Sequence, residues 1–419
     1  MRILVDQSGY DLLNLGDVAM LQGCTARLYQ QWPGAEIRVI AHAPERLQQY
    51  CPGAVAVERT FADLQFVQIF PRRARLASEQ FWKMIGPQLS ERMARQGYQD
   101  DDSQLLPKTA IQAVRWADVV VASGGGYITD TWWWHAAGVL SVIDLAQRLG
   151  KPTAMFGQGI GPLHGRMLRA LARKVLPRLT VLGIREELTS LELALALGTP
   201  RDIIRMTGDD ALEVIADAAA APTDALGVNI RAARYTGIGR DVAAMIGEVV
   251  VDAAGDLQAG IVALPVCRYP AAADLATTRH SLSPASSGTA VTMSDLASPS
   301  ELSAATAGCR IVVAVSYHAA VFALAQGVPA VCLSKSSYYD AKFAGLHAMF
   351  PEACQVVSLT GPDPASKLRR AIQRAWDLPS PVRSAAREAA NRQRDSGSLA
   401  YADFRMNVER LDETVALKG

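Results

Sequence analysis

The feature that most constrains the fold of this chain is a repeated alternation of short β-branched runs, small-residue loops and amphipathic stretches. The first unit begins with the apolar run at 3–5, passes Gly9, and continues from about Asp17 into a stretch whose apolar residues recur at helical spacing. This order is typical of a βαβ unit, in which helices join parallel strands. The alternation therefore predicts an α/β fold.

The alternation comes in two series. Strand-like runs of the first series lie at 3–5, 37–40, 119–121, 154–156 and 181–183, and those of the second lie at 226–230, 261–264, 311–315 and 330–333. A chain of 419 residues exceeds what one hydrophobic core usually organises. We predict a first Rossmann-like domain over 1–220 and a second over 221–380, divided near the alanine-rich stretch 218–221. Since ligands of open parallel sheets bind at the carboxyl ends of the strands, the two domains should face each other across a cleft lined by the strand-end loops.

Two segments depart from the alternation. Residues 58–112 are rich in charge and glutamine, which predicts a helical insertion on the first domain. The polar stretch 381–419 predicts a helical tail that crosses back onto that domain. The sequence Ser298-Pro299-Ser300-Glu301 has a capping serine, a proline at the first helical position and a glutamate three residues after the cap, which predicts a helix before the strand at 311.

Composition excludes several functional classes. Lys and Arg number 42 against 41 Asp and Glu, so no basic excess points to nucleic acid. The apolar stretch 311–333 is interrupted by Ser316, His318 and Gln326, so no membrane span is expected, although peripheral association stays open. The start of the chain lacks a signal-peptide pattern, which favours the cytoplasm.

The six cysteines lack zinc spacing and are interpreted as free buried thiols, and no metal site is expected. The sequence leaves the oligomeric state unknown.

Three loops of the first series could contact a ligand. The loop after the first strand ends in Asn14, Gly16 and Asp17, which could bind an anion or could cap the following helix. After the run at 119–121 come Gly124, Gly125 and Gly126, and Gln158 lies in the glycine-rich loop after the run at 154–156. Glycines there let backbone amides approach a ligand closely, so the two loops predict a cleft floor. Trp132, Trp133 and Trp134 could stack on a sugar ring, but core packing of at least two of them is favoured.

Charged residues mark further strand ends. Arg185 follows the run at 181–183, where a guanidinium suits carboxylate or phosphate recognition, while a salt bridge to Glu186 or Glu187 is an equal alternative. Asp209 lies in another strand-end loop, and Arg231 follows the first strand of the second series. Both are candidates for substrate binding.

His318 is the most informative single residue. It follows the apolar strand 311–315, where sites assemble, although a lone histidine in apolar surroundings is usually a hydrogen-bonded core residue. Its neighbours Ser316 and Tyr317, and Lys342 after the next strand, could line the same cleft.

The ordered motifs resemble the polysaccharide pyruvyl transferase family. The matching segments are NLGDVAML from Asn14, GGG at Gly124, GQGIGPL from Gly157, the Arg185-Glu186 pair, the Asp209 region and HAAVFALAQGVPAV from His318. The resemblance implies a fold like that of the two-Rossmann-domain, GT-B glycosyltransferases, with the acceptor on the first domain and the donor on the second. It also implies transfer of the pyruvyl unit of phosphoenolpyruvate to sugar hydroxyls, with Arg185 contacting the donor and His318 catalytic.

One position departs from the family pattern. Family members often carry an arginine two positions before the histidine, where this chain has Ser316. The missing charge could come from Arg231, Arg268, Lys335 or Lys342.

The chemistry of ketal formation needs an acid for the enol-ether carbon and a basic clamp for phosphate and carboxylate, but no metal or cofactor. A protonated imidazole near neutral pH would suit the acid step. Two alternatives stay open: a nucleotide-sugar glycosyltransferase or epimerase on the same architecture, and a non-catalytic carbohydrate-binding relative.

Overall fold

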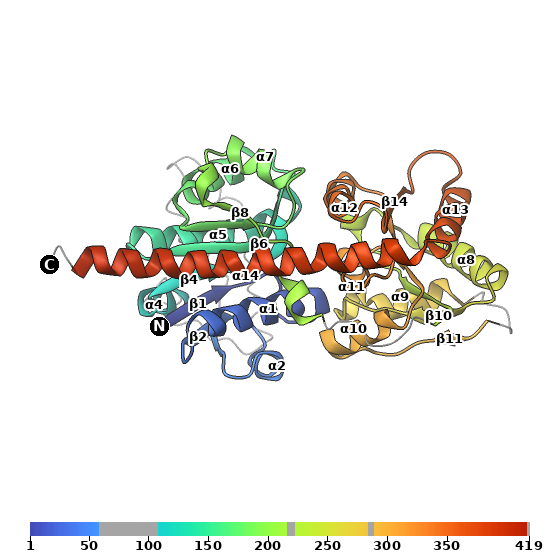
Figure 1. The fold of residues 1–419 in the computed structure, drawn as a ribbon, viewed down its shortest axis with the longest axis horizontal. Helices are drawn as coiled ribbons and strands as arrows, with labels where there is room; N and C mark the ends of the chain where they lie inside the picture. Colours follow the sequence, from blue (N-terminus) through green and yellow to red (C-terminus); the bar gives the residue numbers. More distant parts are fainter. Residues whose placement is uncertain (58–107, 216–222, 284–288, 417–419) are drawn as a thin grey trace, which may run out of the picture.

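A computed structural model of the chain describes residues 1–57, 108–215, 223–283 and 289–416 (Figure 1). Nearly all of the helical insertion predicted over 58–112 lies outside these ranges. Its last residues fall on helix α4 (Lys108–Trp116).

The first sheet has eight strands, in the order β3-β2-β1-β4-β6-β7-β8, with β5 paired to β6. Its strands are β1 (Arg2–Asp6), β2 (Glu36–Ile40), β3 (Val55–Val57), β4 (Val119–Ala122), β5 (Gly125–Ile128), β6 (Thr153–Ile160), β7 (Val181–Ile184) and β8 (Ile204–Met206). The connecting helices are α1 (Leu15–Gln31), α2 (Pro44–Tyr50), α5 (Trp133–Arg148), α6 (Arg166–Val175) and α7 (Ser190–Ala196), with short 3-10 turns such as η2 (Asp130–Trp132) and η5 (Asp210–Val214).

The second sheet has six strands, in the order β11-β10-β9-β12-β13-β14. Its strands are β9 (Ala225–Asn229), β10 (Gly260–Ala263), β11 (Val291–Thr292), β12 (Ile311–Ala314), β13 (Ala330–Ser334) and β14 (Cys354–Ser358). Its helices are α8 (Arg240–Asp256), α9 (Asp274–Ser281), α10 (Pro299–Ala307), α11 (Tyr317–Ala325), α12 (Ser337–Met349) and α13 (Pro364–Trp376).

Neighbouring strands run parallel in both sheets. The central strands β4 and β12 are buried at every residue, as expected where helices cover both faces of a parallel sheet. The prediction of two Rossmann-like α/β domains is thus confirmed. The predicted free thiols are also confirmed, because all six cysteines are buried and unpaired.

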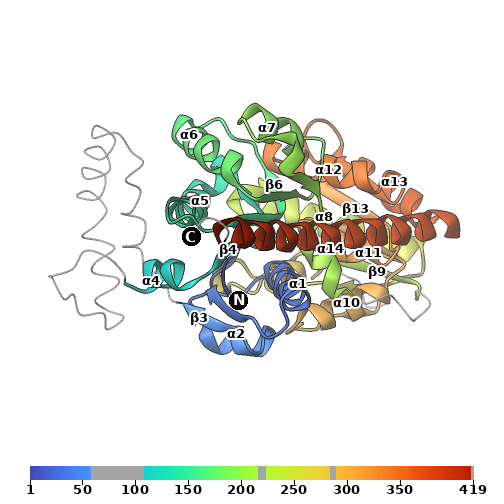
Figure 2. The same cartoon turned by 60° about the vertical axis from the view of Figure 1, so that its left-hand side comes forward.

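Helix α14 (Ser380–Ala416) is 37 residues long and runs along both domains (Figures 1 and 2). Ala386 and Ala390 pack in a cluster with the second domain. Farther along, Tyr401 stacks on Phe156 of β6 with ring centroids 3.7 Å apart, and Phe404 belongs to the same first-domain core. Because one continuous helix is buried against both sheets, it restrains how the domains sit relative to each other.

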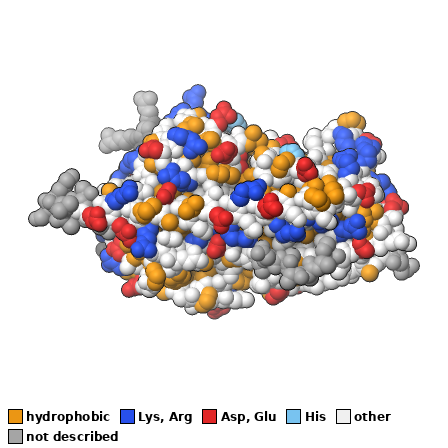
Figure 3. Space-filling view, in the orientation of Figure 1, with side chains coloured by type: hydrophobic (Ala, Val, Ile, Leu, Met, Phe, Trp, Pro, Cys, Tyr) orange, Lys and Arg blue, Asp and Glu red, His pale blue; other side chains and the backbone are white. Residues whose placement is uncertain are grey.

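The solvent face that α14 crosses carries basic and acidic side chains interspersed (Figure 3). Arg205 and Asp403, for example, form an ion pair of 2.6 Å between β8 and α14. This face therefore presents no continuous basic surface. Within the described part of the chain, no helix is long and apolar enough to cross a bilayer.

Backbone hydrogen bonds join the domains at the mouth of α1. The N–H of Leu15 donates to the carbonyl of Val266 (2.9 Å), and the N–H of Arg268 donates to that of Leu13 (2.7 Å). Leu15 also packs in one continuous apolar cluster with residues of α11. The amino end of α1 is therefore held directly against the second domain.

Candidate active site between the two sheets

The amino end of α1 forms one wall of the candidate site. Asn14 caps the helix, because its side-chain oxygen accepts from the N–H groups of Gly16 (3.0 Å) and Asp17 (3.4 Å). His318 of the second domain lies directly over Gly16: a Cβ at Gly16 would come within 2.1 Å of the imidazole Cγ. Only glycine at this position lets the histidine approach so closely.

Asp17 lies in the first turn of α1 and accepts a hydrogen bond from the Ser8 hydroxyl (3.0 Å). Burial raises the pKa of its carboxyl to about 6, partly offset by Ser8 and by the cations of Lys342 and Arg231. Asp17 is therefore mainly ionised at neutral pH and takes up a proton in mild acid.

The three glycines predicted to form a loop lie at the start of β5, since Gly125 and Gly126 are its first two residues, and their roles differ. A Cβ at Gly126 would lie 2.6 Å from Nη2 of Arg185 and from Cε of Lys342, so this glycine leaves room for two cationic side chains. A Cβ at Gly125 would meet the Tyr127 ring at 2.4 Å, and Gly124 packs on Met20. Gly125 and Gly124 are therefore needed for packing within the first domain.

Gln158 is fully buried and lies within β6, which extends to Ile160, so the loop predicted to contain it after 154–156 does not form. Its side-chain amide donates to the carbonyls of Ser123 (2.7 Å) and Phe156 (2.9 Å) and to the Tyr127 hydroxyl (3.1 Å). These hydrogen bonds hold β6 against the segment 123–127, which contains the three glycines.

Arg185 is buried just beyond the end of β7, and its charge is only loosely balanced. Nη1 lies 3.5 Å from Oδ2 of Asp209, and Cζ lies 4.2 Å from the centre of the Tyr317 ring. The salt bridge to Glu186 that the sequence left open does not form. Glu186 instead accepts from the N–H groups of Thr189 (2.9 Å) and Ser190 (3.0 Å).

His318 reaches the same carboxylate from the second domain. Its Nε2 lies 3.7 Å from Oδ2 of Asp209 and has no hydrogen-bond partner among the described residues, although the atom is buried. Burial lowers the pKa of the imidazole to about 4, assisted by the cations of Arg185 and Lys342. In the ligand-free protein these surroundings thus disfavour the protonated imidazole that would suit the acid step, although the carboxylate of Asp209 favours it.

Lys342, in helix α12 of the second domain, lies beside Arg185 and His318. Its ammonium lies 4.3 Å from the centre of the Tyr338 ring, and the Tyr338 hydroxyl donates to the carbonyl of Gly126 (2.9 Å). Burial, together with Arg185, lowers the pKa of Lys342 well below its usual value. Arg185 after β7, His318 in the first turn of α11 and Lys342 of α12 thus lie around Asp209, which follows β8.

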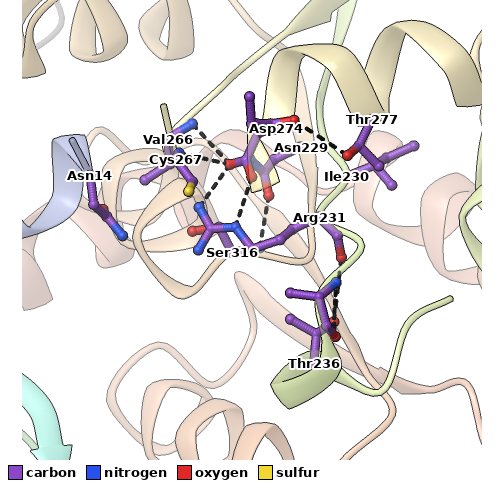
Figure 4. Close-up of polar contacts among 12 residues, drawn as sticks. Asn14, Asn229, Ile230, Arg231, Thr236, Val266, Cys267, Asp274, Thr277 and Ser316 are labelled. Atoms are coloured by element: carbon purple, nitrogen blue, oxygen red, sulfur yellow. Dashed lines mark hydrogen bonds and ion pairs between the residues drawn. The ribbon is translucent and has the colours of Figure 1, made fainter. Parts of the chain in front are cut away.

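Arg231 lies in a separate network of the second domain (Figure 4). Its guanidinium makes two hydrogen bonds to Asp274, at 2.7 and 2.8 Å. Asn229 also donates to Asp274 (2.8 Å), and it accepts from the N–H of Ser316 (2.8 Å). Arg231 and Ser316 are therefore held in the framework of the second domain. Asp274 was not predicted as a functional residue, because it does not directly follow a strand and belongs to no recognised motif.

The tryptophan run differs from expectation. Trp132, Trp133 and Trp134 are 40%, 38% and 39% exposed, so core packing of two of them is wrong. Trp133 and Trp134 stack with centroids 3.7 Å apart, whereas the indole N–H of Trp132 donates to the Tyr338 hydroxyl (3.1 Å). Trp132 thereby links the first domain to the helix that carries Lys342.

No group of three or more histidine, cysteine or acidic side chains in the described ranges could hold a metal ion.

Comparison of the fold with solved structures gives distant matches over nearly the whole chain. A putative UDP-N-acetylglucosamine 2-epimerase from Listeria monocytogenes is 13% identical with a TM-score of 0.55, covering 93% of this chain and 94% of its own. UGT89C1 of Arabidopsis thaliana in complex with UDP is 11% identical, with a TM-score of 0.55 and coverages of 98% and 99%. Anabaena Alr3699/HepE in complex with UDP and glucose is 12% identical, with a TM-score of 0.52 and 99% coverage of both chains. These likenesses establish a GT-B-like fold.

Sequence comparison settles the family. Among curated protein sequences no significant match is found. The family model for polysaccharide pyruvyl transferase, however, matches residues 14–337, which is most of the chain and includes Asn14, Arg185 and His318. The chain therefore belongs to the polysaccharide pyruvyl transferase family.

Proposed function

We propose that this transferase moves the pyruvyl unit of phosphoenolpyruvate onto hydroxyls of a sugar or glycoconjugate and forms a cyclic ketal. The observation that carries the proposal is the cluster of Arg185, Lys342 and His318 around Asp209, at the facing ends of two sheets in a chain of this family. Cations placed there suit a ligand that carries both a phosphate and a carboxylate.

The reaction divides among these groups as follows. His318 delivers a proton to the methylene carbon, and C2 gains oxocarbenium character. An acceptor hydroxyl attacks C2 and loses its proton to a base, for which the ionised carboxylate of Asp17 is suited. The C2–O bond to phosphate breaks and phosphate leaves on the cationic side chains. A second hydroxyl then attacks C2, closes the ketal and gives its proton to His318, which is neutral after the first step.

The neutral state of His318 in the ligand-free protein fits this order of events. Its pKa of about 4 results from burial and from neighbouring cations, and a phosphate bound to those cations would offset their charge. Donor binding therefore raises the pKa of His318 toward neutrality. The histidine becomes an acid when the donor is present.

A second candidate is transfer or epimerisation of a nucleotide sugar, favoured by the structural likeness to UGT89C1 and Alr3699/HepE, both solved with UDP. In this candidate the same cations hold a diphosphate. A non-catalytic carbohydrate-binding role is a third outcome of the test below.

The deciding experiment offers the protein phosphoenolpyruvate or a panel of UDP-sugars together with mixed sugar and glycoconjugate acceptors. Inorganic phosphate released only with phosphoenolpyruvate, and a product heavier than the acceptor by pyruvic acid less one water, supports pyruvyl transfer. Release of UDP supports the second candidate. Binding of a carbohydrate, detected as protection against thermal unfolding without turnover of any donor, supports the third.

A further inference from the structure

The cations between the two sheets differ in how their charge is balanced. Three arginines each have a carboxylate partner: Arg27 with Asp210 at 2.9 Å, Arg231 with Asp274 at 2.7 Å, and Arg185 with Asp209 at 3.5 Å. Lys342 has none: within the described residues it makes no hydrogen bond or ion pair, and its contacts are with the faces of Tyr338, Tyr317 and Tyr339. A positive charge that is half-buried without a carboxylate partner lowers the stability of the folded protein, unless an anionic ligand balances it.

Lys342 and Arg185 also converge on one point. A Cβ at Gly126 would lie 2.6 Å from Nη2 of Arg185 and 2.8 Å from Nζ of Lys342, so the two nitrogens are within a few ångströms of each other. Two positive charges this close repel each other in a partly desolvated site. The arrangement is unfavourable in the empty protein and becomes favourable when an anion lies between them.

A small pocket opens at this point. Its walls include Arg185 and Lys342, the acidic residue Glu186, and the glycines Gly126, Gly159 and Gly161. Three of these residues are glycines, and a Cβ at Gly159 would come within 2.7 Å of the guanidinium of Arg185. The pocket therefore combines two cationic side chains and three glycines with one acidic residue, Glu186, whose carboxylate is occupied by the N–H groups of Thr189 and Ser190. Its volume is only about 10 Å³, so a phosphate group would have to contact the two cations from the open side of the pocket.

We propose that Lys342 and Arg185 form an anion pocket between the two domains, in which Lys342 supplies the second positive charge for a phosphate group of the ligand. Arg185 comes from the first sheet, and Lys342 comes from α12 of the second domain. The other three candidates for a second charge are less suited: Arg231 is satisfied by Asp274, Arg268 lies 3.5 Å from Asp295, and Lys335 is absent from the pocket wall. That the phosphate belongs to phosphoenolpyruvate rests on the proposed function, whereas the anion pocket does not.

The depressed pKa of Lys342 agrees with this assignment. Burial and the charge of Arg185 disfavour its protonated form in the empty pocket, and a phosphate would restore that form. Removal of the charge should thus have opposite effects on the empty and the liganded protein.

The test uses inorganic phosphate as the probe, with calorimetric titration and thermal unfolding of the full chain. We expect K342M to weaken phosphate binding by about tenfold or more and to leave the Tm of the ligand-free protein unchanged or higher. K342R, which keeps the charge, should stay within about threefold of the unmodified protein. K367M removes the same charge from α13, far from the pocket, and should bind phosphate normally.

Three results would overturn the inference: no phosphate binding by the unmodified protein, unchanged binding by a folded K342M, or an equal loss in K367M. If K342M does not fold, the K342R titration still decides, because loss of binding with the charge retained would make Lys342 a packing residue. If phosphate binding depends on Lys342 but phosphoenolpyruvate is never turned over, the pocket stands and the proposed function fails.

Discussion

Each sheet carries a buried arginine just beyond the carboxyl end of a strand, Arg185 after β7 and Arg231 after β9. The guanidinium of Arg231 makes two hydrogen bonds to Asp274 at 2.7 and 2.8 Å. The guanidinium of Arg185 makes one long contact of 3.5 Å with Asp209 and opens onto the pocket beside Lys342. A buried arginine just beyond a strand end is therefore a framework residue in one domain and a site residue in the other, although β7 lies near one edge of its sheet and β9 lies at the centre of its own.

The two arginines differ because their carboxylate partners, Asp274 and Asp209, accept different sets of further hydrogen bonds. Asp274 accepts from Asn229 at 2.8 Å and from the backbone N–H groups of Val266 and Cys267, both at 3.0 Å, so it organises the loop after β10. Asp209 accepts from the N–H of Ala211 (3.0 Å) with Oδ1, and its Oδ2 lies between Arg185 and the unpartnered Nε2 of His318, 3.5 and 3.7 Å away. A buried carboxylate whose hydrogen-bond acceptors are all occupied by protein donors indicates a structural role. A carboxylate that makes only long contacts with two charged or titratable side chains indicates a site that is completed by a ligand.

Replacement of His318 should have the largest effect, because it removes the proton donor from the site of Arg185. We expect H318N to lower turnover of the donor by roughly two to four orders of magnitude, the range of general acid catalysis, with an unchanged Tm. Steady-state kinetics and thermal unfolding measure the two quantities. H280N changes an exposed histidine of α9 and serves as the control. A variant that loses stability more than turnover would identify His318 as a core residue.

Replacement of Arg231 should act on folding. R231M leaves the buried carboxylate of Asp274 without its cation, so we expect a loss of about 3–5 kcal/mol in the free energy of unfolding, measured with urea. The double variant R231M/D274N removes both charges and should recover part of this loss. If R231M has normal stability and a raised KM for the donor, Arg231 is a donor-binding residue. The contrast between a structural Arg231 and a functional Arg185 is then wrong.

Much of the fold was predictable, and the balance of charges was not. Apolar runs identify nine of the fourteen strands in the described residues, whereas β3, β5, β8, β11 and β14 were not predicted. The predicted cap before 311 is confirmed, since Ser298 accepts from the N–H of Glu301 (3.2 Å). Asp274 lies 43 residues beyond Arg231, and no local pattern predicts their pairing. The same holds for the pKa of His318, which depends on cations from three other segments.

A conservative change at Arg185 sharpens the comparison. R185K keeps a positive charge but loses the planar fork, so we expect kcat/KM for the donor to fall by one to two orders of magnitude, on the order of 1.4 to 2.8 kcal/mol, with folding retained. R205K changes a half-exposed arginine that pairs with Asp403 and should be neutral in the same kinetic assay. Unchanged donor kinetics in folded R185K would make Arg185 a structural residue like Arg231.

The smallest expected effect is a pH dependence of stability that belongs to His318. Its folded pKa of about 4 lies below the ordinary value of 6.5, so the unfolded chain binds the proton more tightly between these values. Protonation therefore favours unfolding, and stability that is full above pH 6.5 is lost as the pH falls toward 4. At pH 5.5 this loss amounts to about 1.4 kcal/mol relative to pH 8.

Two buried carboxyls act in the opposite direction. Burial raises the pKa of Asp17 and of Asp210 to about 6, so each contributes stability that is present below its unfolded pKa and is lost as the pH rises through 6. The wild-type curve is a mixture of these effects, and the informative quantity is the difference between wild type and H318N. Urea unfolding at pH 8 and pH 5.5 should show that H318N loses less stability than wild type by about 1.4 kcal/mol. An equal loss in both proteins would mean that the ligand-free site already holds His318 at an ordinary pKa, and the cations around it would then have to be balanced without a ligand.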